Sequence, residues 1–284
     1  MRLSTAKKLA IARALRGFVG AWLKLQGRDP RKVRCTRNGV RWLLDLDEGV
    51  QLALYLGVYE RSTMRALARL ASSDAVVLDV GANIGAQALP LAGRLSAGGR
   101  VIAVEPADAA VVRLRDNCAL NPAVSARVSL VHRSLVAPGD TAPRTYFASW
   151  PLAAPPGAHP VHHGVPEPSS ASWSTLDSLV HELGLTRVDV IKLDVDGNEL
   201  PVLRGASATL ARHHPVVVFE LCPYLLEERG EAPTALTRLF IEHGYALYEE
   251  QTFKPLPGGD EEFIRRIPAG GSVNVVAAVQ PLSA

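Results

Sequence analysis

The fold class of this chain is decided by the stretch Val76-Val77-Leu78-Asp79-Val80-Gly81-Ala82-Asn83-Ile84-Gly85. Its β-branched beginning is typical of a strand that is buried on both faces of a parallel sheet. The two glycines allow backbone conformations and close approaches that a Cβ would prevent. The apolar run from Ile84 to Leu95 predicts a helix after the turn. Strand, glycine-rich turn and helix together form the first unit of a nucleotide-binding α/β sheet.

The turn and the acids around it indicate which nucleotide is bound. A second predicted strand, Arg100 to Val104, is followed by Glu105, at the spacing that suits an acceptor for ribose hydroxyls. The turn lacks the G-x-G-x-x-G pattern of a pyrophosphate site, and Asp79 stands two residues before Gly81. An acid there would repel a pyrophosphate but suits S-adenosylmethionine, which carries an amino group and a sulfonium. The alternative is that Asp79 only caps the loop and the glycines only form a tight turn.

Further motifs continue the pattern along the chain. They are Glu105-Pro106, Ser174-Thr175-Leu176-Asp177-Ser178-Leu179, Ile191 to Glu199, Leu203-Arg204-Gly205-Ala206 and Phe219-Glu220-Leu221. In this order the motifs resemble the FkbM family of S-adenosylmethionine-dependent methyltransferases, from about Tyr59 to Val279. The family usually has Asp-Val-Glu-Gly where this chain reads Asp194-Val195-Asp196-Gly197, which shortens that acid by one methylene.

The remaining strands complete the expected sheet. Val188 to Leu193 and Val216 to Phe219 predict a fourth and a fifth strand, and Tyr245 to Tyr248 and Ser272 to Val279 predict a late pair. We expect a Rossmann-like class I methyltransferase fold, with a mostly parallel twisted sheet, an antiparallel edge strand and helices on both faces. Arg127 to Val131 is the third predicted strand, and Ser134 beyond it could border the adenine.

The predicted cofactor-binding residues are Asp79, Gly81, Asn83, Gly85, Glu105, Pro106 and Ser134. The acids at the ends of the later strands are the catalytic candidates. Methyl transfer to an alcohol needs a group that accepts the hydroxyl proton, and Asp194 at the end of the central strand is our first choice. Asp196, Glu199 and Glu220 could assist, or together hold a divalent ion such as Mg²⁺, although the chemistry does not require a metal. For Glu199, a structural role in the first turn of the following helix is an alternative.

The chemical class of the methyl acceptor is narrowed by residue types that are missing at the end of the fourth strand. Asp194-Val195-Asp196-Gly197 contains neither the proline nor the aromatic residue that amino-group methylation of nucleic acid bases typically uses. The family resemblance implies O-methylation of a sugar, glycolipid or polyketide-type hydroxyl, with no nucleic acid partner. The alternatives are an RNA methyltransferase or RNA-binding module that uses the basic N-terminal segment, and a non-catalytic nucleotide-binding protein.

Charge divides the chain into a predicted basic arm, residues 1–41, and a predicted catalytic domain, residues 42–284. The arm holds twelve lysines and arginines and one acid, Asp29, so the rest of the chain carries −8 within a net charge of +3. Its residues Ile11, Leu15, Phe18, Trp22 and Leu25 fall at helical spacing. This amphipathic helix could lie on an anionic membrane, or its apolar stripe could dock on the domain with the charges solvated. Arginines interrupt it too early for a membrane span or a signal peptide.

The cysteines and one long loop complete the expectations. Cys35, Cys118 and Cys222 lack any pairing or metal-binding spacing, which favours a reducing, cytoplasmic location. Arg144 to Ala148 could form an extra strand, and residues 150–170, rich in proline and glycine, form a candidate substrate cover. The histidines of this loop have no acid or cysteine that completes a metal set, so the plainer interpretation is a polar surface loop.

Overall fold

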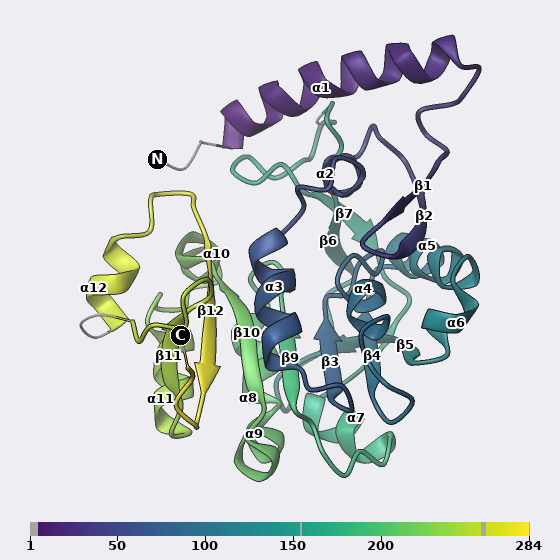
Figure 1. Ribbon diagram of the computed structural model, residues 1–284. Helices are drawn as coiled ribbons and strands as arrows, with labels where there is room; N and C mark the ends of the chain where they lie inside the picture. Colours follow the sequence, from purple (N-terminus) through teal and green to yellow (C-terminus); the bar gives the residue numbers. More distant parts are fainter. Residues whose placement is uncertain (1–4, 154, 257–259, 284) are drawn as a thin grey trace.

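The computed structural model describes residues 5–153, 155–256 and 260–283 (Figure 1). Within these ranges the centre of the molecule is an eight-stranded sheet in the order β11-β12-β10-β9-β3-β4-β5-β8. The strands are β3 (Val76–Val80), β4 (Arg100–Glu105), β5 (Val128–Leu135), β8 (Ser172–Ser174), β9 (Val190–Leu193), β10 (Val216–Leu221), β11 (Ala246–Glu249) and β12 (Val273–Ala278). Neighbours pair in parallel except at β12, which is antiparallel to both β10 and β11. The predicted class I fold is confirmed, and the edge strand β11 is joined by antiparallel pairing.

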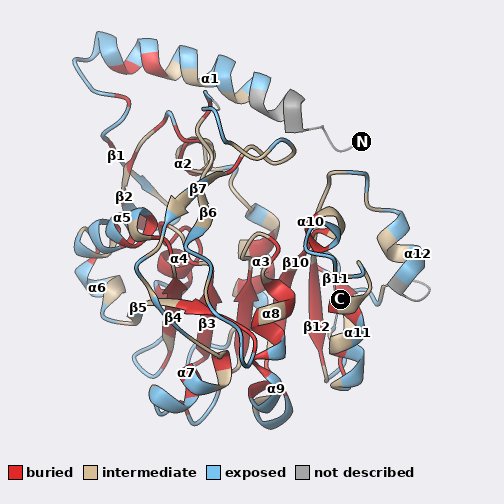
Figure 2. Cartoon of the chain, turned by 180° about the vertical axis from the view of Figure 1, so that it is seen from behind, coloured by how far each residue is buried: buried red, intermediate tan, exposed pale blue. Residues whose placement is uncertain are grey.

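Helices cover both faces of the sheet because successive residues of each strand point to opposite sides. On β3, Val76, Leu78 and Val80 pack in one core cluster, while Val77 packs in the other. The first face is covered by α7 (Leu176–Glu182), α8 (Glu199–Arg204), α9 (Ser207–His213) and α11 (Ala235–Glu242). The second is covered by α3 (Arg61–Leu70), α4 (Ala88–Ala92) and α5 (Asp108–Ala119). The central strands β3 and β9 are buried throughout, as their mostly apolar sequence favours (Figure 2).

Short elements join these layers. They are α2 (Gly49–Tyr55), α6 (Pro122–Ser125), α10 (Pro223–Glu228) and α12 (Asp260–Arg265). A separate antiparallel pair consists of β6 (Thr145–Ser149) and β7 (Val165–Pro168), so the extra strand predicted at 144–148 is confirmed. The expected cover, residues 150–170, contains β7 and is therefore partly ordered by pairing with β6.

The N-terminal segment is packed on the rest of the chain. It contains α1 (Thr5–Leu25) and a hairpin of β1 (Val33–Arg37) and β2 (Val40–Leu44). The boundary expected between residues 41 and 42 falls inside β2, and Trp42 is fully buried in a third core cluster that also contains Leu23 of α1. The side chains of Asn117 and Asn121 on and after α5 accept hydrogen bonds from the backbone of β2. The hairpin is thus part of the folded core.

The contacts of α1 differ from the predicted docking arrangement. Leu23 is buried, Arg16 forms a 2.7 Å ion pair with Asp47, and Arg13 donates a hydrogen bond to the carbonyl of Leu152. The predicted apolar stripe is exposed to solvent instead. Docking through that stripe with the arginines solvated is therefore wrong, because the ion pair of Arg16 and the hydrogen bond of Arg13 hold the opposite side of the helix against the domain.

Two predicted element boundaries also change. The helix expected from Ile84 to Leu95 is only α4, because the turn extends to Gln87 and Gly93 closes the helix. The third strand continues past Val131 to Leu135, since β8 pairs with its last residues. Ser134 consequently lies inside β5 and is buried.

Candidate active site

The turn after β3 brings its backbone against the end of β9. Gly81 has a φ of +80°, and a Cβ at this position would lie 1.9 Å from the carbonyl oxygen of Asp194. Only glycine fits this left-handed conformation and this close approach. Asn83 is also left-handed, with a φ of 48°. The glycine-rich sequence therefore allows the loops of two neighbouring parallel strands to meet at one edge of the sheet.

Glu105 at the end of β4 fixes the shape of this turn. Its two carboxylate oxygens accept hydrogen bonds from the backbone amides of Asn83 and Ala107, each at 2.8 Å. Burial raises its pKa to about 7, against the effect of these two hydrogen bonds. Each carboxylate oxygen has a second lone pair, so Glu105 can also accept from hydroxyl groups of a ligand in the adjacent pocket.

A buried ion pair lies beneath the turn. Asp79 on β3 and Lys192 on β9 are directly opposite each other in the parallel register. The ammonium of Lys192 lies 3.7 Å from Asp79 Oδ1, 3.2 Å from Asp194 Oδ2 and 3.3 Å from the carbonyl oxygen of Gly81. Lys192 and Asp79 are almost completely inaccessible, with 4% and 2% of their side chains exposed. This single cation therefore contacts β3, the end of β9 and the turn that follows β3.

Charge in this cluster is unevenly balanced. Burial disfavours the charged form of Lys192, but the neighbouring carboxylates of Asp194, Asp79 and Glu60 outweigh it and hold the pKa of Lys192 above its usual range. Burial raises the pKa of Asp79 despite Lys192. Lys192 at 3.7 Å thus does not fully compensate for the burial of this acid, so further positive charge nearby would stabilise its charged form.

Lys192 is the residue that sequence reasoning missed. A lysine in the middle of an otherwise apolar predicted strand is a signal, because a charged side chain is rarely fully buried unless it is paired. The structure adds Glu60, just before α3, whose carboxylate accepts a hydrogen bond from Gln87. Burial and the charge of Asp194 raise the pKa of Glu60 to about 8. No comparable pattern marked Glu60 in the sequence.

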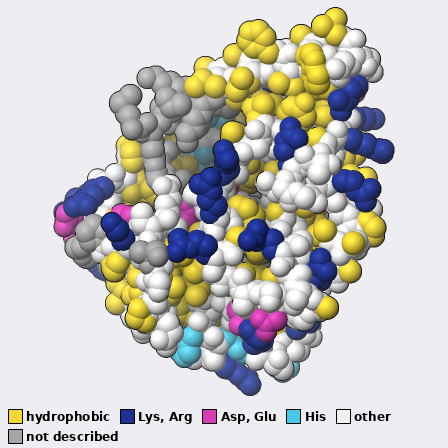
Figure 3. Space-filling view, viewed as in Figure 1, with side chains coloured by type: hydrophobic (Ala, Val, Ile, Leu, Met, Phe, Trp, Pro, Cys, Tyr) yellow, Lys and Arg dark blue, Asp and Glu magenta, His cyan; other side chains and the backbone are white. Residues whose placement is uncertain are grey.

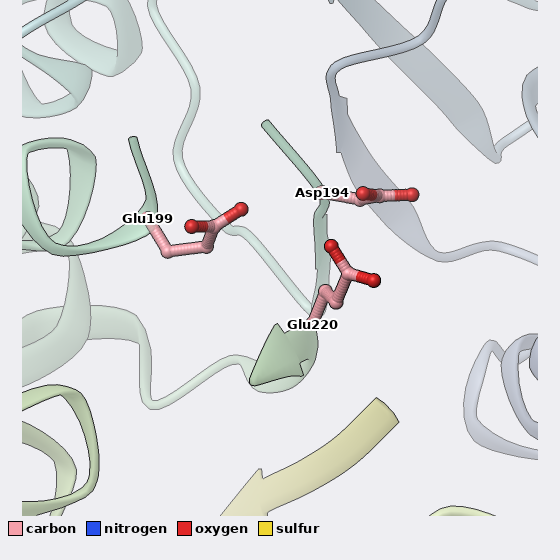
Figure 4. Close-up of side chains that lie close together, drawn as sticks. All are labelled: Asp194, Glu199 and Glu220. Carbon is pink, nitrogen blue, oxygen red and sulfur yellow. The ribbon is translucent and has the colours of Figure 1, made fainter. Parts of the chain in front are cut away.

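The three predicted catalytic acids lie together: Asp194 just after β9, Glu199 at the start of α8 and Glu220 near the end of β10 (Figure 4). Ligand oxygens of Asp194, Glu199 and Glu220 lie within 4.8 Å of one another. Glu199 is fully buried and accepts a 2.9 Å hydrogen bond from the amide of Val195, so it closes the turn that follows β9. Burial raises the pKa of Glu199 to about 7, and burial together with Asp194 and Glu199 raises that of Glu220 to about 8. The three oxygens could hold a divalent cation, and Glu199 also has the structural role that the sequence allowed.

Two cavities meet at Asp194. The first is narrow, about 50 Å³, and is lined by Val80, Gly81, Asn83, Val104, Glu105, Pro106, Arg133, Leu135, Tyr146, Phe147, Asp194, Val195, Asp196, Asn198 and Val202. The second has about 690 Å³ and shares Gly81, Asn83, Asp194 and Asp196 with the first. Sites for molecules of cofactor size usually have 300–1,000 Å³. The narrow cavity is therefore smaller than a nucleoside needs, and Tyr146 and Phe147 of β6 form part of its wall.

The predicted cofactor residues are brought together with one difference. Gly81, Asn83, Glu105 and Pro106 line the narrow cavity, and Asp79 lies buried behind it. Gly85 holds the turn against α5, since a Cβ there would lie 2.5 Å from Leu114. Ser134 is not among the residues that line the narrow cavity. Its hydroxyl forms a hydrogen bond with the hydroxyl of Tyr146, and Tyr146 does line that cavity. Its role beside the adenine stays a prediction.

The histidines of the expected cover lie at the larger cavity. His159 and His162 stack with ring centroids 3.9 Å apart, and Phe147 contacts both edge-on. His159 also pairs with Glu228 at 3.0 Å. His162 and His163 line the cavity, and burial lowers the pKa of His162 to about 4. The loop is therefore a wall of the larger cavity.

Fold and site together define a class I methyltransferase, and comparison with known families gives the same result. Residues 79–247, more than half of the chain, match the Methyltransferase FkbM domain. The chain belongs to the FkbM family of S-adenosylmethionine-dependent methyltransferases, and the predicted resemblance is confirmed. A comparison with curated proteins gives no match.

Solved structures with a similar course of the chain share little sequence with it. Methyltransferase FkbM from Methylobacillus flagellatus KT is 17% identical with a TM-score of 0.42, over 74% of this chain and 45% of that one. Pyrococcus horikoshii TYW2 in complex with MeSAdo is 16% identical with a TM-score of 0.45, over 92% and 81%. A putative rRNA-methylase from Clostridium thermocellum is 9% identical with a TM-score of 0.46, over 78% and 95%.

The residues present fit the cofactor of this family. Burial keeps the pKa of Asp79 raised even beside Lys192, so a cationic ligand nearby would stabilise its charged form, and Gly81 leaves the space that a side chain would fill. Glu105 retains lone pairs for ribose hydroxyls, and Pro106 with Leu135 supplies apolar walls. When bound here, S-adenosylmethionine supplies a methyl group on a positively charged sulfur.

Glu105 is expected to control cofactor affinity. Glu105→Ala removes the acceptor for ribose hydroxyls and frees the amide of Asn83, so S-adenosylmethionine should bind about 10- to 100-fold more weakly, given 1.5–3 kcal/mol for charged hydrogen bonds. Calorimetric titration measures this change. Glu227→Ala, at an exposed glutamate of α10, is the matched control and should bind like the original protein. Unchanged affinity in Glu105→Ala would refute the assignment.

Lys192 is expected to be essential to stability. Lys192→Met leaves Asp79 and Asp194 without their buried cation, so the free energy of unfolding should fall by about 3–5 kcal/mol. Denaturant titration measures it, with Lys254→Met at an exposed position as the control. Adding Asp79→Asn should restore part of the loss, because one uncompensated charge is removed. A loss within 0.5 kcal/mol, the usual range for surface substitutions, would contradict the role of this ion pair.

Proposed function

We propose that the protein transfers a methyl group from S-adenosylmethionine to a hydroxyl of a sugar, glycolipid or polyketide-type small molecule. The observation that carries this proposal is the position of Asp194, which lines both the narrow cavity beside Glu105 and the larger cavity. A cofactor in the first and an acceptor in the second would meet at this carboxylate. Because the reaction needs its partners held in line at close range, a shared wall suits methyl transfer.

Asp194 is the proposed general base. A hydroxyl is a weak nucleophile until its proton begins to leave, and a carboxylate within hydrogen-bond distance can accept that proton. Lys192 holds Oδ2 at 3.2 Å, and no hydrogen bond to Oδ1 is found among the described residues. Oδ1 is therefore the oxygen that faces the acceptor in this proposal. Lys192 positions the base and does not itself contact the acceptor.

The lining of the larger cavity supports a polyhydroxylated acceptor. Its described part contains four carboxylates, from Glu60, Asp194, Asp196 and Glu220, but no lysine or arginine. Carboxyl groups form hydrogen bonds with hydroxyls whether or not they are protonated, and a lining without lysine or arginine offers no cation to a phosphodiester, so this lining favours a sugar-like molecule over a nucleic acid. The rings of Tyr59, Trp150 and Tyr224 provide apolar surface for the carbon faces of such a molecule.

A metal-assisted form of the same reaction is the second version of the proposal. Mg²⁺ held by Asp194, Glu199 and Glu220 would lower the pKa of a bound hydroxyl. Because Glu199 and Glu220 have raised pKa values, metal binding would release protons and strengthen as the pH rises. Asp194 is required in both versions. The simple base needs fewer groups and is our preferred version.

A cytoplasmic location belongs to the same proposal. Cys35, Cys118 and Cys222 are all free thiols. Free thiols persist in reducing compartments, which supports the cytoplasm as the place of action.

Asp194→Asn tests the general base. The substitution retains size and most hydrogen bonding but removes basicity, so turnover should fall by about 10²- to 10⁴-fold with little change in cofactor affinity. The measurement uses labelled S-adenosylmethionine and a panel of glycans, glycolipids, polyketide-type alcohols and RNA to find the acceptor first. Asp116→Asn, at an exposed aspartate of α5, is the matched control.

The same assay separates the two versions. Activity that is lost with a chelator and restored by Mg²⁺ would establish the metal-assisted version, whereas the simple base is indifferent to chelation. An Asp194→Asn enzyme that methylates its acceptor at the original rate would eliminate both. Methylation of RNA alone in the panel would overturn the proposed acceptor class.

A further inference from the structure

The outer face of α1 carries an unpartnered apolar stripe. Its members are Ile11, Leu15, Phe18, Trp22 and Leu25, of which Phe18 is 79% exposed and Leu25 is 88% exposed. Their spacing places them along one side of the helix. The opposite side is fixed to the domain through Leu23, Arg13 and Arg16. Large apolar side chains in one continuous exposed row mark an interaction surface, unlike isolated ones.

Basic side chains gather beyond the C-terminal end of this stripe. Lys24, Arg28, Arg31, Lys32 and Arg34 are all exposed, and Asp29 is the only acid in the first 41 residues. Figure 3 shows the hydrophobic side chains along the top of the molecule and lysine and arginine side chains beside their right-hand end. The same surface is thus apolar along the helix and strongly positive next to it.

We propose that this face of α1 binds the surface of an anionic lipid bilayer. A helix with an apolar face inserts that face at the boundary of headgroups and acyl chains, and nearby cations are attracted to anionic lipids. Phe18 and Trp22 are side chains that such interfacial helices commonly use. Among the described residues, every helix is too short or too polar to span a bilayer, so the contact would be peripheral.

Charge favours this occupant over a second copy of the chain. Pairing of two α1 helices would bring together two N-terminal segments, residues 1–41, each of which carries an excess of eleven positive charges. Like charges across an interface oppose association, whereas anionic headgroups satisfy the apolar stripe and the cations at once. Nucleic acid would satisfy the cations but would leave five large apolar side chains in water.

The inner side of α1 is joined to the wall of the larger cavity. Arg13 donates to the carbonyl of Leu152, and the carbonyl of neighbouring Trp150 accepts from Gly49. Glu48 in turn accepts from the amide of Trp150, which lines the cavity. Figure 1 shows α1 across the molecule, with α2, β6 and β7 between it and the sheet. Resting on the proposed function, this arrangement favours an acceptor that is itself attached to the membrane.

The experiment measures vesicle binding of the full chain and needs no enzymatic activity, so its outcome is independent of the proposed reaction. Vesicles of phosphatidylcholine with 30% phosphatidylglycerol and vesicles of phosphatidylcholine alone are sedimented with the protein. The test variant is F18E/W22E on α1. The matched control is V112E/W173E, which places the same charge change at two exposed apolar residues elsewhere, with Trp173 as exposed as Trp22.

We expect binding to the anionic vesicles and at least tenfold less to the neutral ones, with a marked loss in 1 M salt, where screening limits electrostatic attraction to about 3 Å. F18E/W22E should lose at least tenfold in binding and V112E/W173E should bind like the original protein. Equal binding by F18E/W22E, or no binding by the original protein, would overturn the proposal. A dimer in lipid-free solution that F18E/W22E abolishes would also overturn it, in favour of a second copy.

Discussion

The site depends on one buried cation. Lys192 lies opposite Asp79 in the sheet register and also contacts Asp194 and the carbonyl of Gly81. It therefore joins β3, β9 and the cofactor turn at a point that water does not reach. Removing a charged side chain from water is unfavourable unless its partners compensate for it. The proposed base and the glycine turn are thus both in contact with the same buried cation.

This cation does not balance all the acids around it. Glu60, Asp79, Asp196 and Glu220 all have raised pKa values, with burial as the largest cause in each case. Raised pKa values mean that these carboxyl groups take up protons readily instead of accumulating negative charge in a poorly solvated site. A cation bound nearby, such as a sulfonium, would lower these pKa values and favour the charged carboxylates.

Local sequence predicted the parts of the structure that depend on local rules. The turn at Gly81, Glu105 at the end of β4 and Asp194 at the end of β9 follow from strand periodicity and from the meeting of parallel strand ends at one edge. The partners of Lys192 were not predictable in this way, because Asp79 lies far away in the sequence. The periodicity of α1 predicted its apolar stripe. It did not predict which side of the helix faces the domain, because that depends on contacts with Asp47 and Leu152. Residues 150–170 lack alternation, so the pairing of β7 with β6 left no signal.

In the proposed reaction, cofactor and acceptor meet at Asp194, with the cofactor held between Gly81 and Glu105. A crystal structure of the protein with S-adenosylhomocysteine would locate the cofactor directly. We expect both ribose hydroxyls to lie within hydrogen-bond distance of Glu105, Tyr146 and Phe147 to have moved outward, and the sulfur to face the larger cavity beside Asp194. A ribose bound away from Glu105, or a sulfur turned away from Asp194, would rule out this arrangement.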